Sequence, residues 1–383
     1  MTAAALPINR DYIRDLMVEF LNIPSPSGYT DAVVRRAVAE CERLGVSYEL
    51  TRRGAIRVLM PGQKESPKRA IAAHLDTLGA MVKNIKDNGR LEVTRIGYWA
   101  ARFAEGARVT IFTDKGSRRG TILPLKASGH TFNDEIDTQI SAWENLEIRV
   151  DEPCDSKRQL ELLGFNVGDY VAIDPGTEVS PNGFINSRHL DDKAGVAALF
   201  GTIRAMREGD ITPAVDSYFL FTISEEVGSG ASAVLHGDVA EMVSVDNGTP
   251  APGQNSSELG VTISMMDSTG PFDYHLTHRL LELCRNNGIA HQRDVFRYYR
   301  SDLATAVEAG NDIRTALVCF GVDASHGWER IHLDSLAGIA SLLTAYLQSP
   351  PTTWRDRLRM NPDLEGLPQQ PGADNPAPPI FTH

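Results

Sequence analysis

The sequence has few cysteines and no long apolar run. Only four of its 383 residues are cysteine, Cys41, Cys154, Cys284 and Cys319, and none has the spacing of a disulfide framework. Scattered thiols favour a reducing compartment, so we expect a cytoplasmic protein. No uncharged apolar stretch reaches the ~18 residues of a membrane helix, and the first residues lack the basic-then-apolar pattern of an export signal. We therefore expect neither membrane insertion nor export.

Clustered positive charge is also missing. Lys and Arg number 38 against 50 Asp and Glu, which gives a formal net charge of −12, and no dense basic run occurs. Because nucleic-acid-binding surfaces need such a patch, nucleic acid is not an expected partner. With 42% hydrophobic and 23% charged residues, the composition excludes collagen-like, disulfide-rich and wholly disordered classes. Small molecules or peptides are the expected partners.

Hydrophobic periodicity predicts an α/β framework that is interrupted by a β-rich insertion. Helical spacing and short apolar runs alternate in residues 1–80 and again in residues 175–349, which predicts one α/β domain in two segments. Residues 81–174 instead carry short β-prone runs between Gly, Asp and Asn turns, typical of a small β-rich domain. Residues 350–383 are rich in proline and poor in large apolar residues, which predicts a flexible tail.

The first candidate site residues end the apolar run at 70–73. His74 and Asp76 are spaced i, i+2, which on a strand points both side chains to one side. A metal-binding imidazole usually donates its second N–H to a carboxylate, so Asp76 could orient His74 as a ligand. Taken alone, the pair is explained as well by an exposed strand-end histidine beside a solvated aspartate.

Two pairs of adjacent carboxylates follow. Asp191 and Asp192 precede an apolar helix, where a single aspartate would be an ordinary N-cap. With two, one carboxylate could bridge two cations while its neighbour fixes the turn. Glu225 and Glu226 follow the apolar run at 217–223, where adjacent carboxylates are costly unless water or a metal compensates them. Adjacent side chains on an extended chain face opposite ways, so one of these glutamates could bind metal while the other activates water. The alternative is that both glutamates lie on a loop and are simply solvated.

Further along the chain, single residues complete a ligand set. Asp246 ends the run at 242–246, where open α/β sheets place ligand groups, and His326 follows the run at 313–321, with His332 as its competitor. Each is weak evidence alone, since a histidine can simply be a core residue. Together the candidates supply two imidazoles and three carboxylates, which suit Zn²⁺, Co²⁺ or Mn²⁺ with open positions. These candidates are His74, Asp191, Glu226, Asp246 and His326.

The ordered motifs HLD, DDKAG, EEVGSG, VD and a late His resemble those of the dinuclear metallo-aminopeptidases of the glutamyl aminopeptidase and tetrahedral (TET) type, over nearly the whole chain up to Ser349. The resemblance implies a peptidase domain with a central mixed sheet flanked by helices, interrupted by a β-barrel-like dimerisation domain. The segment LGFNVGDYVAIDP resembles the end of that dimerisation domain. It further implies self-association to dimers that can build a dodecamer. A narrower similarity, in LPLKASGH, RYYRSD and HGWERIHLDSL, is to the bacterial subgroup associated with the osmoprotectant N-acetylglutaminylglutamine amide.

The same resemblance assigns roles by position. It implies two divalent metal ions per chain, with Asp191 as the bridge, His74 and Asp246 completing one site, and Glu226 and His326 completing the other. Zn²⁺ or Co²⁺ is the expected metal, with Mn²⁺ as a further option.

The remaining roles concern catalysis. The resemblance implies that Glu225 is the general base, that Asp76 supports His74 and that the Asp191–Asp192 bond is cis. The implied reaction is hydrolysis of N-terminal residues from short peptides through a hydroxide held by the two metals.

This sequence departs from the related pattern at one segment. Tyr298, Tyr299 and Arg300 stand where many relatives carry glycines, so they could narrow the substrate cleft, or Arg300 could meet an acidic substrate. Substrate specificity is therefore not carried over. The Ser-Pro that commonly follows the last histidine is also missing after His326, which leaves His332 open as the last ligand.

Two other functions compete with the aminopeptidase hypothesis. One is a glycoside hydrolase, endoglucanase-like, that uses Glu225 and Glu226; its carboxylates would have to face each other at ~5–9.5 Å, whereas neighbours on an extended strand diverge. The other is a metal-free scaffold or binding protein that keeps the fold without the chemistry.

Overall fold

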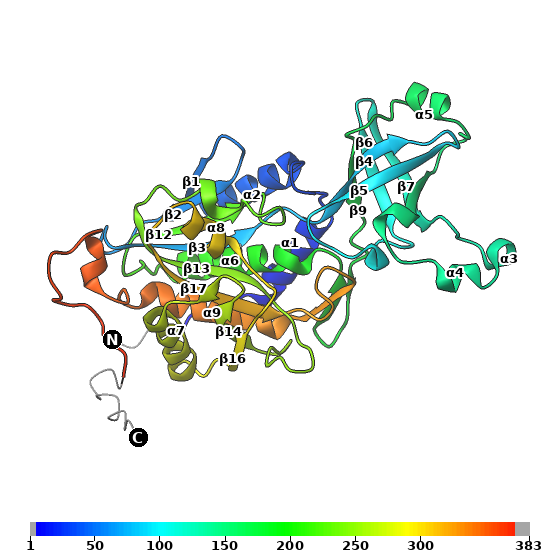
Figure 1. Ribbon diagram of the computed structural model, residues 1–383. Coiled ribbons are helices and arrows are strands. Elements are labelled where there is room, and N and C mark those ends of the chain that lie inside the picture. Colours follow the sequence, from blue (N-terminus) through cyan, green and yellow to red (C-terminus); the bar gives the residue numbers. More distant parts are fainter. Residues whose placement is uncertain (1–4, 372–383) are drawn as a thin grey trace, which may run out of the picture.

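A nine-stranded mixed sheet organises the larger part of the protein (Figure 1). The structure is a computed structural model that describes residues 5–371. The strand order is β1-β2-β12-β3-β13-β17-β14-β15, and β16 pairs with β14. The strands are β1 (Ser47–Leu50), β2 (Ile56–Met60), β3 (Lys68–His74), β12 (Ser217–Thr222), β13 (Val239–Gly248), β14 (Val261–Asp267), β15 (Gly270–Pro271), β16 (His291–Val295) and β17 (Arg314–Gly321).

The centre of the sheet is parallel. Strands β12, β3, β13 and β17 run in one direction, with antiparallel neighbours β2 and β14 outside them. Every residue of β12 is buried, as expected for a strand that is covered on both faces. Because the four parallel strands end at the same edge, the polar residues at their carboxyl ends are brought together there.

Helices cover both faces of this sheet (Figure 1). The longest, α6, is buried along nearly its whole length and packs against α1, α9, β3 and β13. The second helix ends at Gly45 with φ 66°, a left-handed C-cap conformation that glycine adopts without strain. The helices of this domain are α1 (Arg10–Leu21), α2 (Asp31–Leu44), α6 (Leu190–Glu208), α7 (Tyr274–Asn286), α8 (Asp302–Glu308) and α9 (Leu333–Gln348). None of the described helices is long and apolar enough to cross a membrane.

The insertion is a closed six-stranded barrel that projects from the α/β domain (Figure 1). It has its own apolar core, and closure leaves no free sheet edge. Three short helices, α3 (Gly129–Phe132), α4 (Glu135–Thr138) and α5 (Lys157–Leu163), decorate it. Its strands, in the order β4-β5-β8-β7-β6-β9, are β4 (Gly79–Ile85), β5 (Arg90–Ile96), β6 (Arg108–Thr113), β7 (Gly116–Pro124), β8 (Leu146–Val150) and β9 (Tyr170–Ile173).

The predicted fold class, an α/β domain with a mixed sheet and a barrel-like insertion, is confirmed. Some local details differ. Asp246 does not end its strand, because β13 stays paired with β17 through Asn247 and Gly248. A second sheet of β10 (Glu178–Val179), β11 (Phe184–Ser187) and β18 (Glu329–His332) was not predicted, since these strands are too short for a clear period.

The first part of the predicted flexible tail has definite partners. Arg69 donates hydrogen bonds to the carbonyl oxygens of Ser349 (2.8 Å) and Pro350 (2.6 Å), and the Thr352 amide donates to Glu241 (2.5 Å). The rest of that predicted tail, residues 372–383, lies outside the described residues.

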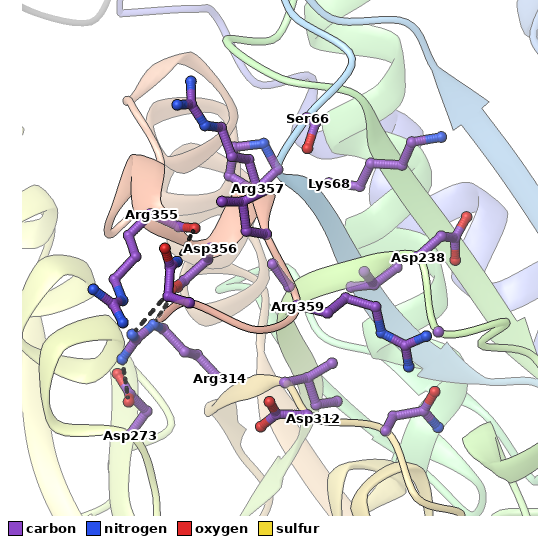
Figure 2. Close-up of a pocket in the computed structure, with 18 residues that line it drawn as sticks. Ser66, Lys68, Asp238, Asp273, Asp312, Arg314, Arg355, Asp356, Arg357 and Arg359 are labelled. Atoms are coloured by element: carbon purple, nitrogen blue, oxygen red, sulfur yellow. Dashed lines mark hydrogen bonds and ion pairs between the residues drawn. The ribbon is translucent and has the colours of Figure 1, made fainter. Parts of the chain in front are cut away.

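Residues 355–361 close over the amino ends of β3, β13 and β17, opposite to the carboxyl edge. Figure 2 shows the hollow beneath them, into which side chains of both signs project. Arg314 lies at its wall and pairs with Asp273 (2.9 Å) and with Asp356 of the tail (2.5 Å). Residues 350–356 are thus bound to the sheet through main-chain hydrogen bonds and an ion pair.

We predict that the buried pair beneath this segment is essential to stability. Arg69 and Glu241 are 0% and 1% exposed and lie 3.0 Å apart, and the Tyr346 hydroxyl also donates to Glu241 (2.8 Å). Arg69→Met leaves Glu241 buried without its cation, so the free energy of unfolding should fall by ~3–5 kcal/mol in urea denaturation. The control is Arg14→Met, whose partners Asp11 and Asp15 are exposed; a loss below ~1 kcal/mol is expected there. Equally small losses in both variants would contradict the prediction.

Candidate metal centre

His74 is the last residue of β3 and is almost fully buried. Its Nδ1 donates to the main-chain oxygen of Asp76 (2.9 Å), and its Nε2 lies 3.1 Å from Oδ1 of Asp191. A carbonyl oxygen can only accept, so the proton is on Nδ1 and Nε2 is left as the ligand atom. The sequence assigned this orienting role to the Asp76 carboxylate; that group lies 3.6 Å from Nδ1, and the closer partner is the main chain of the same residue.

Asp191 lies between the two candidate histidines. Its Oδ1 faces His74, and its Oδ2 faces Nε2 of His326 at 3.3 Å. The bond to Asp192 is cis, as the resemblance implies. Asn247 donates to Asp191 Oδ2 (2.5 Å), and Asp192 accepts from the His74 amide (2.9 Å). One carboxylate therefore presents an oxygen to each side of the site.

The loop after β12 carries Glu225 and Glu226 in two directions. Glu225 Oε2 lies 3.9 Å from Nε2 of His74, whereas Glu226 Oε2 lies 3.6 Å from Nε2 of His326. Both main-chain amides donate to the carboxylate of Asp76, at 3.1 and 3.3 Å. Asp76 thus positions the loop that carries both glutamates.

His326 lies on the loop between β17 and β18. Its φ of 62° is left-handed, and its Nδ1 donates to the main-chain oxygen of Tyr98 in the barrel (2.8 Å). Glu329, a residue that sequence reasoning missed, accepts from the amides of both His326 (2.9 Å) and Asp191 (3.1 Å). It joins the two halves of the site through their backbones.

The geometry brings all five predicted ligands together as two groups that share one residue. His74, Asp191 and Asp246 form one group, and within it the ligand atoms lie within 4.8 Å of one another. The second group, with the same spacing, consists of Asp191, Glu226 and His326.

The buried carboxylates of the site carry more negative charge than its imidazoles can balance, and their pKa values reflect this. Burial raises the pKa of Asp246 to about 7 and that of Glu226 to about 8, each with help from the charge of Asp191. Burial alone would lower the pKa of His326, but the carboxylates of Glu226 and Asp191 raise it to about 11. Oδ1 of Asp192 and Oε1 of Glu226 are buried without a hydrogen-bond partner among the described residues. Such a donor set fits cations.

His332, the competitor for the last ligand position, has other partners. Its Nε2 donates to the oxygen of Asn182 (2.9 Å), and its Nδ1 accepts from the Asp334 amide at the start of α9 (3.1 Å). Its ring packs edge-on against Phe184. It belongs to neither ligand group.

The segment that departs from the related pattern borders the site. Tyr298 is 96% exposed, and Arg300 forms an ion pair with Glu308 (2.7 Å), so its guanidinium already has a carboxylate partner. The Tyr299 hydroxyl is buried and points toward the Asp246 carboxylate, where its donor character lowers the pKa of that group. It makes no hydrogen bond of standard geometry with any described residue.

Sequence reasoning also missed Asn247 and Asp302. Asn247 follows Asp246 directly, and a second polar side chain at the carboxyl end of a buried strand was the signal that could have identified it. Asp302 accepts hydrogen bonds from the Thr222 hydroxyl and from the Ala231 amide, both at 2.7 Å, and so holds the two ends of the loop after β12. No local signal separates it from an ordinary helix N-terminal aspartate.

Comparison with solved structures defines the class. The chain superimposes on a TET aminopeptidase from Thaumarchaeota archaeon SCGC AB-539-E09 with a TM-score of 0.80 and 20% identity, over 88% of this chain and 96% of that one. It is similarly close to the TET1 peptidase of Pyrococcus horikoshii, with a TM-score of 0.78 and 23% identity over 88% of this chain and 100% of that one. The fold is that of a TET-type peptidase.

Sequence comparison gives the family. Residues 54–342 match the model of the M42 glutamyl aminopeptidases. The chain is 38% identical, over 88% of its length and 97% of the relative, to the Bacillus subtilis protein named "Putative aminopeptidase YhfE". The chain belongs to the M42 glutamyl aminopeptidase family, and its enzymatic class is peptide-bond hydrolysis at the N-terminus.

Two buried serines provide a test of how Asp76 is held. The Ser27 hydroxyl donates to the Asp76 carboxylate (2.5 Å), and the Ser25 hydroxyl donates to the neutral oxygen of Leu75 (2.8 Å). Hydrogen bonds to charged groups are worth ~1.5–3 kcal/mol and neutral ones ~0.5–1.5 kcal/mol. Ser27→Ala should therefore destabilise the protein more than the matched Ser25→Ala in urea denaturation. The reverse order would show that Ser27 is not a significant partner of that carboxylate.

Proposed function

We propose that this protein is a two-metal aminopeptidase that removes N-terminal residues from short peptides, with Glu225 as the general base. One observation carries the proposal: the two ligand groups share Asp191, and Glu225 belongs to neither of them although it lies 3.9 Å from His74. The other buried carboxylates beside the five candidate ligands accept hydrogen bonds from main-chain amides, and Glu225 is the one left for proton transfer.

The residues fit a pair of divalent ions. Asp191 would bridge them, since its two oxygens face different imidazoles. His74 with Asp246 and Glu226 with His326 would complete the two sites. Mixed imidazole and carboxylate donors suit Zn²⁺, Co²⁺ or Mn²⁺. Bound ions of this kind polarise the scissile carbonyl and acidify water.

The protein's own residues supply the proton transfers. The amide of Glu225 is anchored by Asp76, which keeps its carboxylate facing the ligand groups. We assign to that carboxylate the proton of the attacking water. It then passes the proton to the leaving nitrogen as the C–N bond breaks, so that the products are a free amino acid and a peptide shortened by one residue.

The two competing functions find less support. Glu225 and Glu226 face different histidines, His74 and His326, rather than each other, which does not suit a pair that must act across one glycosidic bond. A metal-free scaffold would have no reason to keep so many carboxylates buried together, because each is costly without a compensating cation.

We further propose that the barrel, the insertion predicted at residues 81–174, mediates self-association to dimers, and that dimers can build a dodecamer. The likeness to the Pyrococcus horikoshii TET1 peptidase supports this, because that protein can assemble into a tetrahedron or a large octahedral shell. Exposed apolar side chains on the insertion, Ile140, Leu162 and Val167, are suited to such contacts. We place the enzyme in the cytoplasm because its four cysteines are free thiols.

A role in osmoprotectant dipeptide metabolism rests on the sequence similarity alone. N-acetylglutaminylglutamine amide has no free α-amine, so an aminopeptidase would act on a precursor, a by-product or a deacetylated form. Whether cleavage requires a free α-amine on the substrate is therefore the property to test first.

The first experiment tests metal dependence and the amine requirement together. Protein stripped of metal should not cleave alanyl, leucyl, glutamyl or lysyl p-nitroanilides, and Zn²⁺, Co²⁺ or Mn²⁺ should restore cleavage of at least one of them. The N-acetylated counterparts should stay intact. Chelator-insensitive cleavage, or cleavage of acetylated substrates at equal rates, would overturn the proposal.

Glu225→Gln separates the base from the ligands. The amide cannot accept the proton of water, so kcat should fall by ~10²–10⁴-fold while metal content stays at the wild-type level. Metal content is measured by elemental analysis after dialysis. Near-full activity in this variant would refute the role of Glu225.

Asp191→Asn is the complementary variant. A neutral amide bridges two cations poorly, so this protein should lose metal as well as activity. If Glu225→Gln lost metal to the same extent, Glu225 would have to be counted among the ligands.

A further inference from the structure

The hydroxyl of Tyr299 is buried beside the Asp246 carboxylate and has no hydrogen-bond partner of standard geometry among the described residues. A buried hydroxyl left unpaired costs ~1–3 kcal/mol, so such groups are uncommon unless a ligand satisfies them. Its neighbour Tyr298 is 96% exposed and does not face the same space. Within this pair of tyrosines, only Tyr299 offers a donor to the interior.

Packing explains how Tyr299 reaches the site. Its ring lies against Phe296, with centroids 5.4 Å apart. Phe296 in turn fills the space beside Gly248, where a Cβ would lie 3.4 Å from the Phe296 ring. Gly248 is two residues beyond Asp246 on β13, and therefore the tyrosine is held next to the strand that carries a candidate ligand.

The segment that carries Tyr299 is also fixed at both ends. The main-chain oxygen of Tyr299 accepts a hydrogen bond from the Ser268 amide (2.9 Å). Three residues on, Asp302 accepts from the Thr222 hydroxyl and the Ala231 amide, which flank the loop of Glu225. Tyr299 and the proposed base are therefore held on one framework, which is a requirement for a preorganised donor.

We propose that the Tyr299 hydroxyl donates a hydrogen bond to the oxygen of the scissile carbonyl as that oxygen gains negative charge. The inference rests on the proposed function. Water's oxygen bonds to the carbonyl carbon, the π electrons move to the carbonyl oxygen, and the water proton goes to Glu225. When the C=O bond re-forms, the C–N bond breaks and the nitrogen takes the proton from Glu225. Tyr299 keeps its own proton throughout.

A hydroxyl in this position acts on the transition state more than on the bound substrate. The carbonyl oxygen carries little charge in the ground state and a full charge in the tetrahedral state, so the donor strengthens mainly during reaction. Loss of the hydroxyl should thus lower kcat and leave KM nearly unchanged.

The test is Tyr299→Phe, which removes the hydroxyl and keeps the ring that packs on Phe296. Using the aminoacyl p-nitroanilide that the wild type cleaves fastest, we expect kcat to fall by about 10²-fold, the typical cost of losing one oxyanion donor. KM, melting temperature and metal content should match the wild type. The matched control is Tyr298→Phe, which removes the same atom from an exposed neighbour and should change none of these quantities.

The outcomes separate the two proposals. If the metal-loaded wild type cleaves no substrate, the proposed function fails and this inference fails with it. If the wild type is active and Tyr299→Phe keeps its kcat, only the assignment of Tyr299 is overturned. Lower metal content in Tyr299→Phe would also overturn it, because the hydroxyl would then support the ligand Asp246 rather than the substrate.

Discussion

The structure depends on a concentration of buried carboxylates at one edge of the sheet. Removing each from water costs several kcal/mol, and backbone amides, two imidazoles, one asparagine and two hydroxyls offset only part of that cost. The surrounding fold must supply the remainder, which explains the wholly buried β12 and the almost completely buried α6 directly beneath the site. The buried carboxylates gathered there are Asp76, Asp191, Asp192, Asp246, Asp302 and Glu329, and beside them lie Glu225 and Glu226, whose side chains are 13% and 3% exposed.

The residues of this site differ in how well they could be predicted from sequence. His74 and Glu225 stand at the ends of strongly apolar runs, so their placement at one sheet edge follows from periodicity and parallel pairing. Glu329 could not be found in this way, because it reaches the site from a four-residue strand whose partner, β11, is remote in sequence. Likewise, periodicity could not show that His332 caps α9, since capping depends on side-chain geometry.

The fold was predictable to a similar degree. The change from helical period to short β-prone runs indicated the insertion, and its closure into a barrel depended on the family resemblance, since strand order depends on tertiary contacts. The start of the tail was predicted less well, because its composition resembles that of disordered segments. Arg69, Arg314 and Glu241 bind it through polar contacts, which an argument from hydrophobicity does not detect.

The contact between His326 and the barrel has an evolutionary consequence. The barrel contributes to the site through the main-chain oxygen of Tyr98, while the side chain of that residue is 77% exposed. Selection at this position therefore acts on the path of the loop rather than on the identity of the residue. The hydrogen bond to His326 does not depend on the side chain at 98, but the inserted domain cannot be deleted as an independent module without releasing an imidazole of the catalytic domain.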